Sequence, residues 1–179
     1  MIRRARLEDA PRLAEVHTLS WRETYPGLVP DRFLERMTSA AVQLRREENW
    51  RHHLAQPDEV AWVAEVSGEL VGFASGGPAR PHPVIGPEYG GELYTLYLLK
   101  AAHGQGLGRV LFSAAAQSLQ AQGHQGLVVW VLAGNPARQF YRHLGGVELG
   151  GKLEPTSFGE LEEVALGWPD LREWAAQHR

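Results

Sequence analysis

The most chemically informative part of the sequence is a glycine-rich turn between a predicted strand and a predicted helix. The turn reads His103-Gly104-Gln105-Gly106-Leu107-Gly108-Arg109. Glycine lacks a β-carbon and lets backbone amides approach a ligand closely. Amides at the start of a helix have no intrahelical acceptor, and the helix dipole adds positive potential there. The amides from 104 to 109 are therefore predicted to bind an anion such as a phosphate or a pyrophosphate.

Two common phosphate-binding patterns do not fit this turn. A nucleoside-triphosphate loop ends in Gly-Lys-Ser/Thr, whereas Arg109 and Val110 follow Gly108 here. The dinucleotide fingerprint Gly-x-Gly-x-x-Gly is also missing, and the preceding strand carries the polar residues Thr95 and Tyr97. Spacing alone leaves a second interpretation open, in which the segment is a plain glycine-rich turn with a helix cap.

The elements that position the turn are predicted from hydrophobic periodicity and from turn signals. Strands are expected at 2–6, 60–66, 70–74, 92–99, 127–132, 147–153 and 162–167. Helices are expected from an N-cap at Asp9 to before Tyr25, from Asp31, and at 39–55, 109–122 and 135–144, with a last one after Pro169. Residues 76–91 are rich in Gly and Pro and are expected to form a loop. This order predicts a mixed sheet with helices on its faces, in which a hairpin supplies antiparallel pairs and two crossovers supply parallel ones.

Composition narrows the classes of function. The 179 residues correspond to a single domain, 1–179, with 44% hydrophobic and 22% charged residues. The formal net charge of -3 gives no basic excess for nucleic acid, and no apolar run is long enough to span a membrane. The N-terminus does not resemble a signal peptide, so a cytoplasmic location is expected. With no cysteine, disulfides, thiolate metal sites and cysteine nucleophiles are excluded.

The remaining charged and histidine residues suggest little chemistry. His52 and His53 are adjacent and lack the i,i+4 spacing of a helical metal site, so no metal is predicted. The run Arg45-Arg46-Glu47-Glu48 is interpreted as a solvated helix face.

The glycine-rich turn resembles motif A of the GNAT superfamily of N-acetyltransferases, Gln/Arg-x-x-Gly-x-Gly/Ala. The matching positions are His103, Gly106 and Gly108, with His103 standing where Gln or Arg is usual. The segment from Asn135 to Gly146 resembles motif B, in which Asn, Ala, an aromatic pair and a final Gly recur. Residues 21–27 and 30–34 resemble the family's first two helices, so the resemblance covers nearly the whole chain.

The resemblance implies a mixed, mostly antiparallel sheet with a splayed strand pair that holds acetyl-CoA. The pyrophosphate of the coenzyme would bind the turn that contains His103, Gly104, Gln105, Gly106, Leu107, Gly108 and Arg109. The backbone of Leu96 and Leu98 would pair with the pantetheine arm, and the Leu98 amide would face the thioester oxygen. Asn135 would contact a pantetheine amide, although a pure N-cap role fits the sequence equally well.

The same resemblance implies direct transfer of an acetyl group to a primary amine. Tyr141 would be the general acid for the departing thiolate; the alternative is that it only packs its helix onto the sheet. Glu92 is the candidate general base, and its alternative is an exposed carboxylate at the sheet edge. Tyr94 shares the face of Glu92 and is expected to line the acceptor pocket, together with His17 and Trp21. His17 is the weakest of these assignments, because a lone His on an apolar helix face is more often structural.

The identity of the acceptor is not predicted. A small molecule and a peptide are both open as the amine substrate. Homodimers are common in the family and are one expectation here. The competing functions are transfer of a different acyl group and a non-catalytic acyl-CoA-binding regulatory domain.

Overall fold

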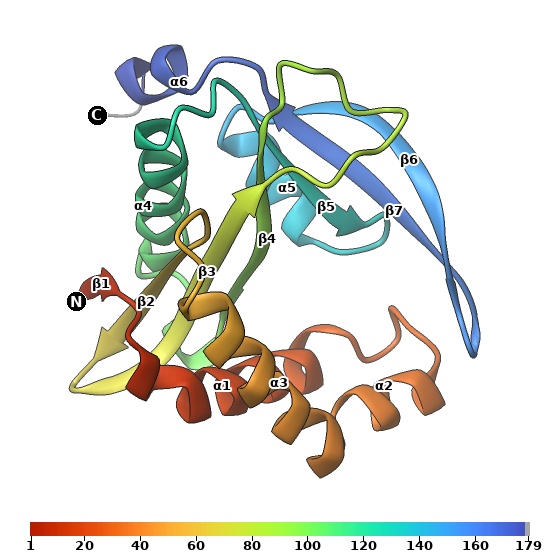
Figure 1. Cartoon of the computed structure of the whole chain (residues 1–179). Helices are drawn as coiled ribbons and strands as arrows, with labels where there is room; N and C mark the ends of the chain where they lie inside the picture. The colour runs from red at the N-terminus through yellow and green to blue at the C-terminus, as the bar shows by residue number, and fades with distance from the viewer. Residues whose placement is uncertain (178–179) are drawn as a thin grey trace.

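A computed structural model describes residues 1–177 and is built on one seven-stranded sheet (Figure 1). The spatial strand order is β1-β2-β3-β4-β5-β7-β6. The strands are β1 (Ile2–Arg4), β2 (Val60–Val66), β3 (Glu69–Pro78), β4 (Gly91–Leu98), β5 (Leu127–Leu132), β6 (Val147–Thr156) and β7 (Gly159–Trp168). Every pair is antiparallel except β4 with β5. The mixed, mostly antiparallel sheet is confirmed; the last two residues of the predicted domain, 178 and 179, lie outside the described part.

Only one of the two predicted crossovers gives a parallel pair. The first crossover places β5 beside β4, while the second carries the chain to β6 at the sheet edge. β7 returns between β5 and β6 and pairs antiparallel with both. The long β6–β7 hairpin extends away from the rest of the sheet toward α2 (Figure 1).

The helices cover both faces of the sheet. They are η1 (Leu7–Asp9), α1 (Ala10–Thr24), α2 (Asp31–Met37), α3 (Ala40–Leu54), η2 (Lys100–Ala102), α4 (Leu107–Ala121), α5 (Ala137–His143) and α6 (Leu171–Gln177). Consecutive strand residues point to opposite faces. Accordingly, Phe73 of β3 packs with α1 and α3, while its neighbour Ala74 packs with α4.

Two predicted helix starts and the predicted loop at 76–91 can be compared with the structure in detail. Ser39 caps α3, because its hydroxyl accepts a hydrogen bond from the Val42 amide at 3.3 Å. Asp9 is the N-cap residue of α1, as predicted, but its side chain makes no capping hydrogen bond to that helix: its carboxylate binds the Arg3 guanidinium at 2.8 and 2.9 Å instead. Gly76 and Gly77 belong to β3 rather than to a loop. A β-carbon on Gly76 would lie 2.6 Å from the Glu92 carbonyl, so glycine permits this close approach to β4.

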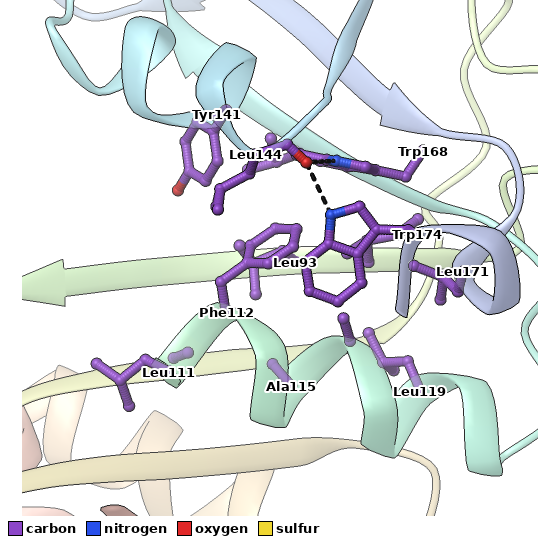
Figure 2. Packing of buried hydrophobic residues seen from close by; sticks show 14 of the residues in the cluster. Leu93, Leu111, Phe112, Ala115, Leu119, Tyr141, Leu144, Trp168, Leu171 and Trp174 are labelled. Carbon is purple, nitrogen blue, oxygen red and sulfur yellow. Dashed lines mark hydrogen bonds between the residues drawn. The ribbon is translucent and has the colours of Figure 1, made fainter. Parts of the chain in front are cut away.

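The larger core cluster fixes α5 and α6 against the sheet. The indole nitrogens of Trp168 and Trp174 both donate to the Leu144 carbonyl, at 2.8 and 2.7 Å (Figure 2). The Phe112 ring of α4 packs against both indoles, with centroids 4.8 and 5.1 Å away. The end of α5 is therefore anchored by buried hydrogen bonds, which hold the helix that carries Tyr141 in one position.

β4 and β5 separate after three residue pairs. Their pairing covers only Gly91 to Leu93 on β4 and Leu127 to Val129 on β5. β4 continues to Leu98, and β5 stays paired with β7 along its other edge as far as Leu132. Among residues 1–177, the rest of the β4 edge consequently has no strand partner, which confirms the predicted splayed pair.

Candidate active site

A cleft of about 1610 Å³ opens where β4 and β5 separate. Its floor is β4, and its walls come from α1, α3, the glycine-rich turn, α5 and the β6–β7 hairpin. The tip of the hairpin meets α2: Arg36 donates to the Ser157 hydroxyl at 3.3 Å, and the Phe33 and Phe158 rings lie 6.2 Å apart. The cleft is therefore bounded by segments from both ends of the chain.

The glycine-rich turn has the geometry of an anion site. Gly104 and Gly106 adopt φ of 74° and 75°, a left-handed conformation that side chains disfavour. Gly106 directly precedes α4, and the first amide bonded back to it is that of Val110. Within residues 1–177, the amides from Gly104 to Arg109 donate to no acceptor. These unpaired donors converge with the positive end of the α4 dipole.

His103 binds the end of β4. Its Nε2 lies 2.8 Å from the Leu98 carbonyl oxygen, so the ring ties the turn to the strand. His103 differs from the residue types that are usual at this position of the motif, and it has a structural role here. Its imidazole binds the Leu98 carbonyl next to the unpaired amides of the turn.

The free edge of β4 presents the amides of Leu96 and Leu98. The Leu99 amide donates to Val71 of β3 at 2.9 Å. Successive amides of a strand point to opposite edges, so those of Leu98 and Leu96 point away from β3, into the opening. An extended ligand in the opening would pair with them as an added strand.

Tyr141 lies on α5 at the wall of the cleft. Its side chain is 95% covered, and its ring packs 6.3 Å from Phe112 and 6.2 Å from Trp168. The hydroxyl points away from the two indoles (Figure 2). Burial, and secondarily the neighbouring Tyr97, raises the pKa of the phenol well above its usual value, so it stays protonated at neutral pH. Packing and proton donation are compatible roles for this residue.

Asn135 caps α5 and also lines the cleft. Its Oδ1 accepts from the Ala137 amide at 2.9 Å, and the residue is 7% exposed. Its Nδ2 has no hydrogen-bond partner among the described residues. The cap therefore uses only Oδ1 and leaves Nδ2 available for another partner.

Glu92 is fully buried, so the alternative of an exposed edge carboxylate is wrong. Its carboxylate is held by Arg80 of the β3–β4 loop. The Arg80 amide donates to Oε2 at 2.9 Å, Nε lies 3.1 Å from Oε1, and the terminal Nη2 also contacts Oε1. Arg80 also lies over the Tyr94 ring, 5.4 Å from its centroid, so the shared face of Glu92 and Tyr94 is confirmed.

The predicted acceptor residues His17, Trp21 and Tyr94 all line the cleft. Burial, with Arg46 second, lowers the pKa of His17 to about 3, so its imidazole is neutral. Burial and the neighbouring carboxylates of Glu59 and Glu92 raise the pKa of Tyr94 to about 12, and its hydroxyl donates to the Pro78 carbonyl at 2.7 Å.

Three cleft residues were missed by sequence reasoning. Tyr25 and Tyr97 join α1 to β4 through a 2.8 Å hydrogen bond between their hydroxyls. Arg46 was assigned to a solvated face, and this is wrong: it is only 6% exposed and lies against α1. Arg46 lies three residues after the first turn of α3 and four residues before the buried Trp50, so the two side chains share one face of the helix. This spacing is the signal in the sequence that could have revealed the burial of Arg46.

Residues 1–177 contain neither a cluster of metal-ligating side chains nor a helix able to span a membrane. No group of three or more His, Asp or Glu side chains gathers there in a way that could hold a metal ion. None of the helices within 1–177 has the length and apolar content to cross a bilayer.

Comparison with known proteins identifies the class to which this fold and cleft belong. The model of the acetyltransferase (GNAT) family matches residues 13–145. An uncharacterized N-acetyltransferase, YuaI of Bacillus subtilis, is 35% identical over 170 residues, covering 95% of this chain and 93% of that protein. The chain therefore belongs to the GNAT family and is an acetyltransferase.

Solved structures show the same fold. The PaiA N-acetyltransferase of Thermoplasma acidophilum, in complex with coenzyme A, matches with a TM-score of 0.66 and 21% identity over 92% of this chain and 96% of that one. The acetyltransferase YncA of Salmonella typhimurium, with acetyl-CoA, matches with a TM-score of 0.70 and 21% identity, covering 96% and 93%. The predicted family and fold class are thus confirmed.

Proposed function

We propose that this protein transfers the acetyl group of acetyl-CoA directly to a primary amine. The observation that carries the proposal is the row of unpaired amides from Gly104 to Arg109 beside the free edge of β4. A pyrophosphate can bind the unpaired amides, and an extended pantetheine arm can pair with the free edge of β4. That two structural neighbours are complexes with coenzyme A and acetyl-CoA supports this choice of ligand.

The reaction follows from the groups around the opening. The neutral amine attacks the thioester carbon, a C–N bond forms, and negative charge develops on the carbonyl oxygen. The Leu98 amide donates to that oxygen. The C–S bond then breaks, and the Tyr141 hydroxyl, protonated because it is buried, donates its proton to the departing thiolate. The acylated nitrogen, which carries the extra proton of the attacking amine, releases that proton, and it restores the Tyr141 hydroxyl. No covalent enzyme intermediate is required.

The amine must first lose a proton, and Glu92 is the proposed general base. Because both carboxylate oxygens contact Arg80, Glu92 would take the proton through a water molecule rather than from the amine directly. His17 is a weak base, since burial lowers its pKa to about 3.

A thiol-release assay with acetyl-CoA and a panel of primary amines tests the proposal, together with calorimetry of CoASH binding. We expect CoASH to bind and at least one amine to release thiol and yield an N-acetyl product. Binding without turnover for any amine would favour the regulatory acyl-CoA-binding domain. Faster turnover with a longer acyl-CoA thioester than with acetyl-CoA would indicate that the protein transfers a different acyl group. Absence of CoASH binding would overturn the proposal altogether.

A further inference from the structure

Arg46 is a buried cation without a counter-charge. It lies on α3, is 6% exposed, and forms no ion pair with any carboxylate in residues 1–177. One terminal nitrogen, Nη1, donates to the Thr18 hydroxyl at 3.0 Å, while Nη2 is buried with no partner. Buried charges in proteins are normally paired, and an unpaired one costs folding free energy. The position of this unpaired cation beside the cleft indicates that its partner is a ligand that enters the cleft.

Two further unpaired nitrogens lie on the same wall. His17 Nδ1 is buried without a partner, and Trp21 Nε1 approaches the Tyr97 hydroxyl but makes no hydrogen bond of ordinary geometry. The Arg46 guanidinium lies 5.2 Å from the centroid of the Trp21 ring. Guanidinium and indole nitrogens can only donate, so the missing group must be a hydrogen-bond acceptor.

A side cavity beside Arg46 has room for such a group, and none of the residues that line this cavity is a carboxylate. This cavity of about 170 Å³ is lined by His17, Arg46, Asn49, Tyr94 and three other residues. Burial and repulsion by Arg46 keep His17 neutral, and the Tyr25 and Tyr97 hydroxyls bond to each other. A planar carboxylate matches the two-nitrogen fork of a guanidinium, and such charge-assisted pairs are among the stronger hydrogen bonds.

We propose that the acceptor amine carries a carboxylate that binds Arg46, which makes the substrate a small amino acid or an amine of that type. The inference rests on the proposed acetyl transfer and names the substrate class of that site. Trp21, Tyr25 and Phe33 form an aromatic wall beside the guanidinium, which suits an apolar side chain on the same substrate.

The test compares L-amino acids with the amines that lack their carboxylate, phenylalanine against phenethylamine for example, in the thiol-release assay. We expect kcat/KM to favour the amino acids by at least about a hundredfold, because a site built for hydrogen bonding strongly rejects analogues that lack the group. Arg46→Met should abolish the preference, so that within this variant kcat/KM for phenylalanine falls to about the value for phenethylamine. Arg46→Lys, which keeps the charge but not the fork, should retain part of it.

Arg51→Met is the matched control. Arg51 lies on the same helix, but it is exposed, pairs with Glu47 and does not line the cleft. The control should keep the full preference. Equal turnover of amino acids and decarboxylated amines by the parent, or an unchanged preference in Arg46→Met, overturns the inference.

Calorimetry separates this inference from the proposed function. N-acetyl-L-phenylalanine should bind the CoA-loaded protein, its carboxamide should bind at least tenfold more weakly, and Arg46→Met should remove the difference. If no N-acetyl amino acid binds while CoASH does, the carboxylate site is wrong and the acetyltransferase function stands. If Arg46→Met weakens CoASH itself, Arg46 belongs to the coenzyme site and the inference also fails.

Discussion

The coenzyme side and the acceptor side of the cleft differ in the kind of chemical group that faces the opening. On the coenzyme side, the groups that face the opening are backbone amides of the glycine-rich turn and of the β4 edge. On the acceptor side, they are side chains brought together from α1, α3 and β4. A backbone site is fixed by conformation and tolerates many residue types, whereas a side-chain site changes with each substitution. This contrast predicts that the coenzyme side keeps the same ligand when residues are exchanged. The acceptor substrate, in contrast, should depend on the particular side chains of this protein.

Tyr141→Phe has the largest expected effect on catalysis. The variant keeps the ring that packs on Phe112 and Trp168 but loses the proton that the thiolate needs. General acid catalysis contributes about 10²–10⁴-fold, so we expect kcat to fall about a thousandfold with CoASH affinity unchanged. Steady-state kinetics and calorimetry measure the two quantities. Turnover at the parental rate would show that Tyr141 only packs.

Glu92→Gln should have the next largest effect. If Glu92 is the base, the amide of the variant cannot accept a proton, and kcat should fall about a hundredfold. The variant also removes the charge that binds Arg80. Arg80→Gln is therefore the companion: it breaks the same pair but leaves the carboxylate. Equal losses of kcat in both variants would make Glu92 a positioning residue for the β3–β4 loop.

Gly106→Val tests the backbone side. A valine at φ 75° costs about 1–2 kcal/mol and displaces the amides that begin α4, so CoASH affinity should fall about five- to thirtyfold. Gly68→Val is the control, because Gly68 has φ 84° in the β2–β3 turn and does not line the cleft. Both variants should lose thermal stability, but only Gly106→Val should lose coenzyme. Equal coenzyme binding in the two would remove the turn from the site.

The same contrast explains what could be predicted from the sequence. The turn from Gly104 to Arg109 was visible because a local spacing of glycines encodes a local conformation, and the splayed strands followed from the family motifs around it. Arg46 was not visible, because it lies in a run of charges and its burial depends on contacts with Thr18 and Trp21, 28 and 25 positions earlier in the chain. The pairing of Glu92 with Arg80 was missed for the same reason, since a loop residue supplies the partner.

Asn135→Ala has the smallest expected effect and refines the boundary between the two sides. Loss of the Oδ1 bond to the Ala137 amide should cost about 1 kcal/mol of unfolding free energy, as for other helix caps. If Nδ2 also contacts the pantetheine arm, CoASH affinity should fall about three- to tenfold as well, the net value of one hydrogen bond. Asn135→Asp separates the two roles, because its carboxylate can still cap α5 but has no N–H to donate. Denaturant unfolding and calorimetry on both variants decide the matter. If Asn135→Ala weakens CoASH binding and Asn135→Asp does not, capping of α5 is the whole function of this side chain.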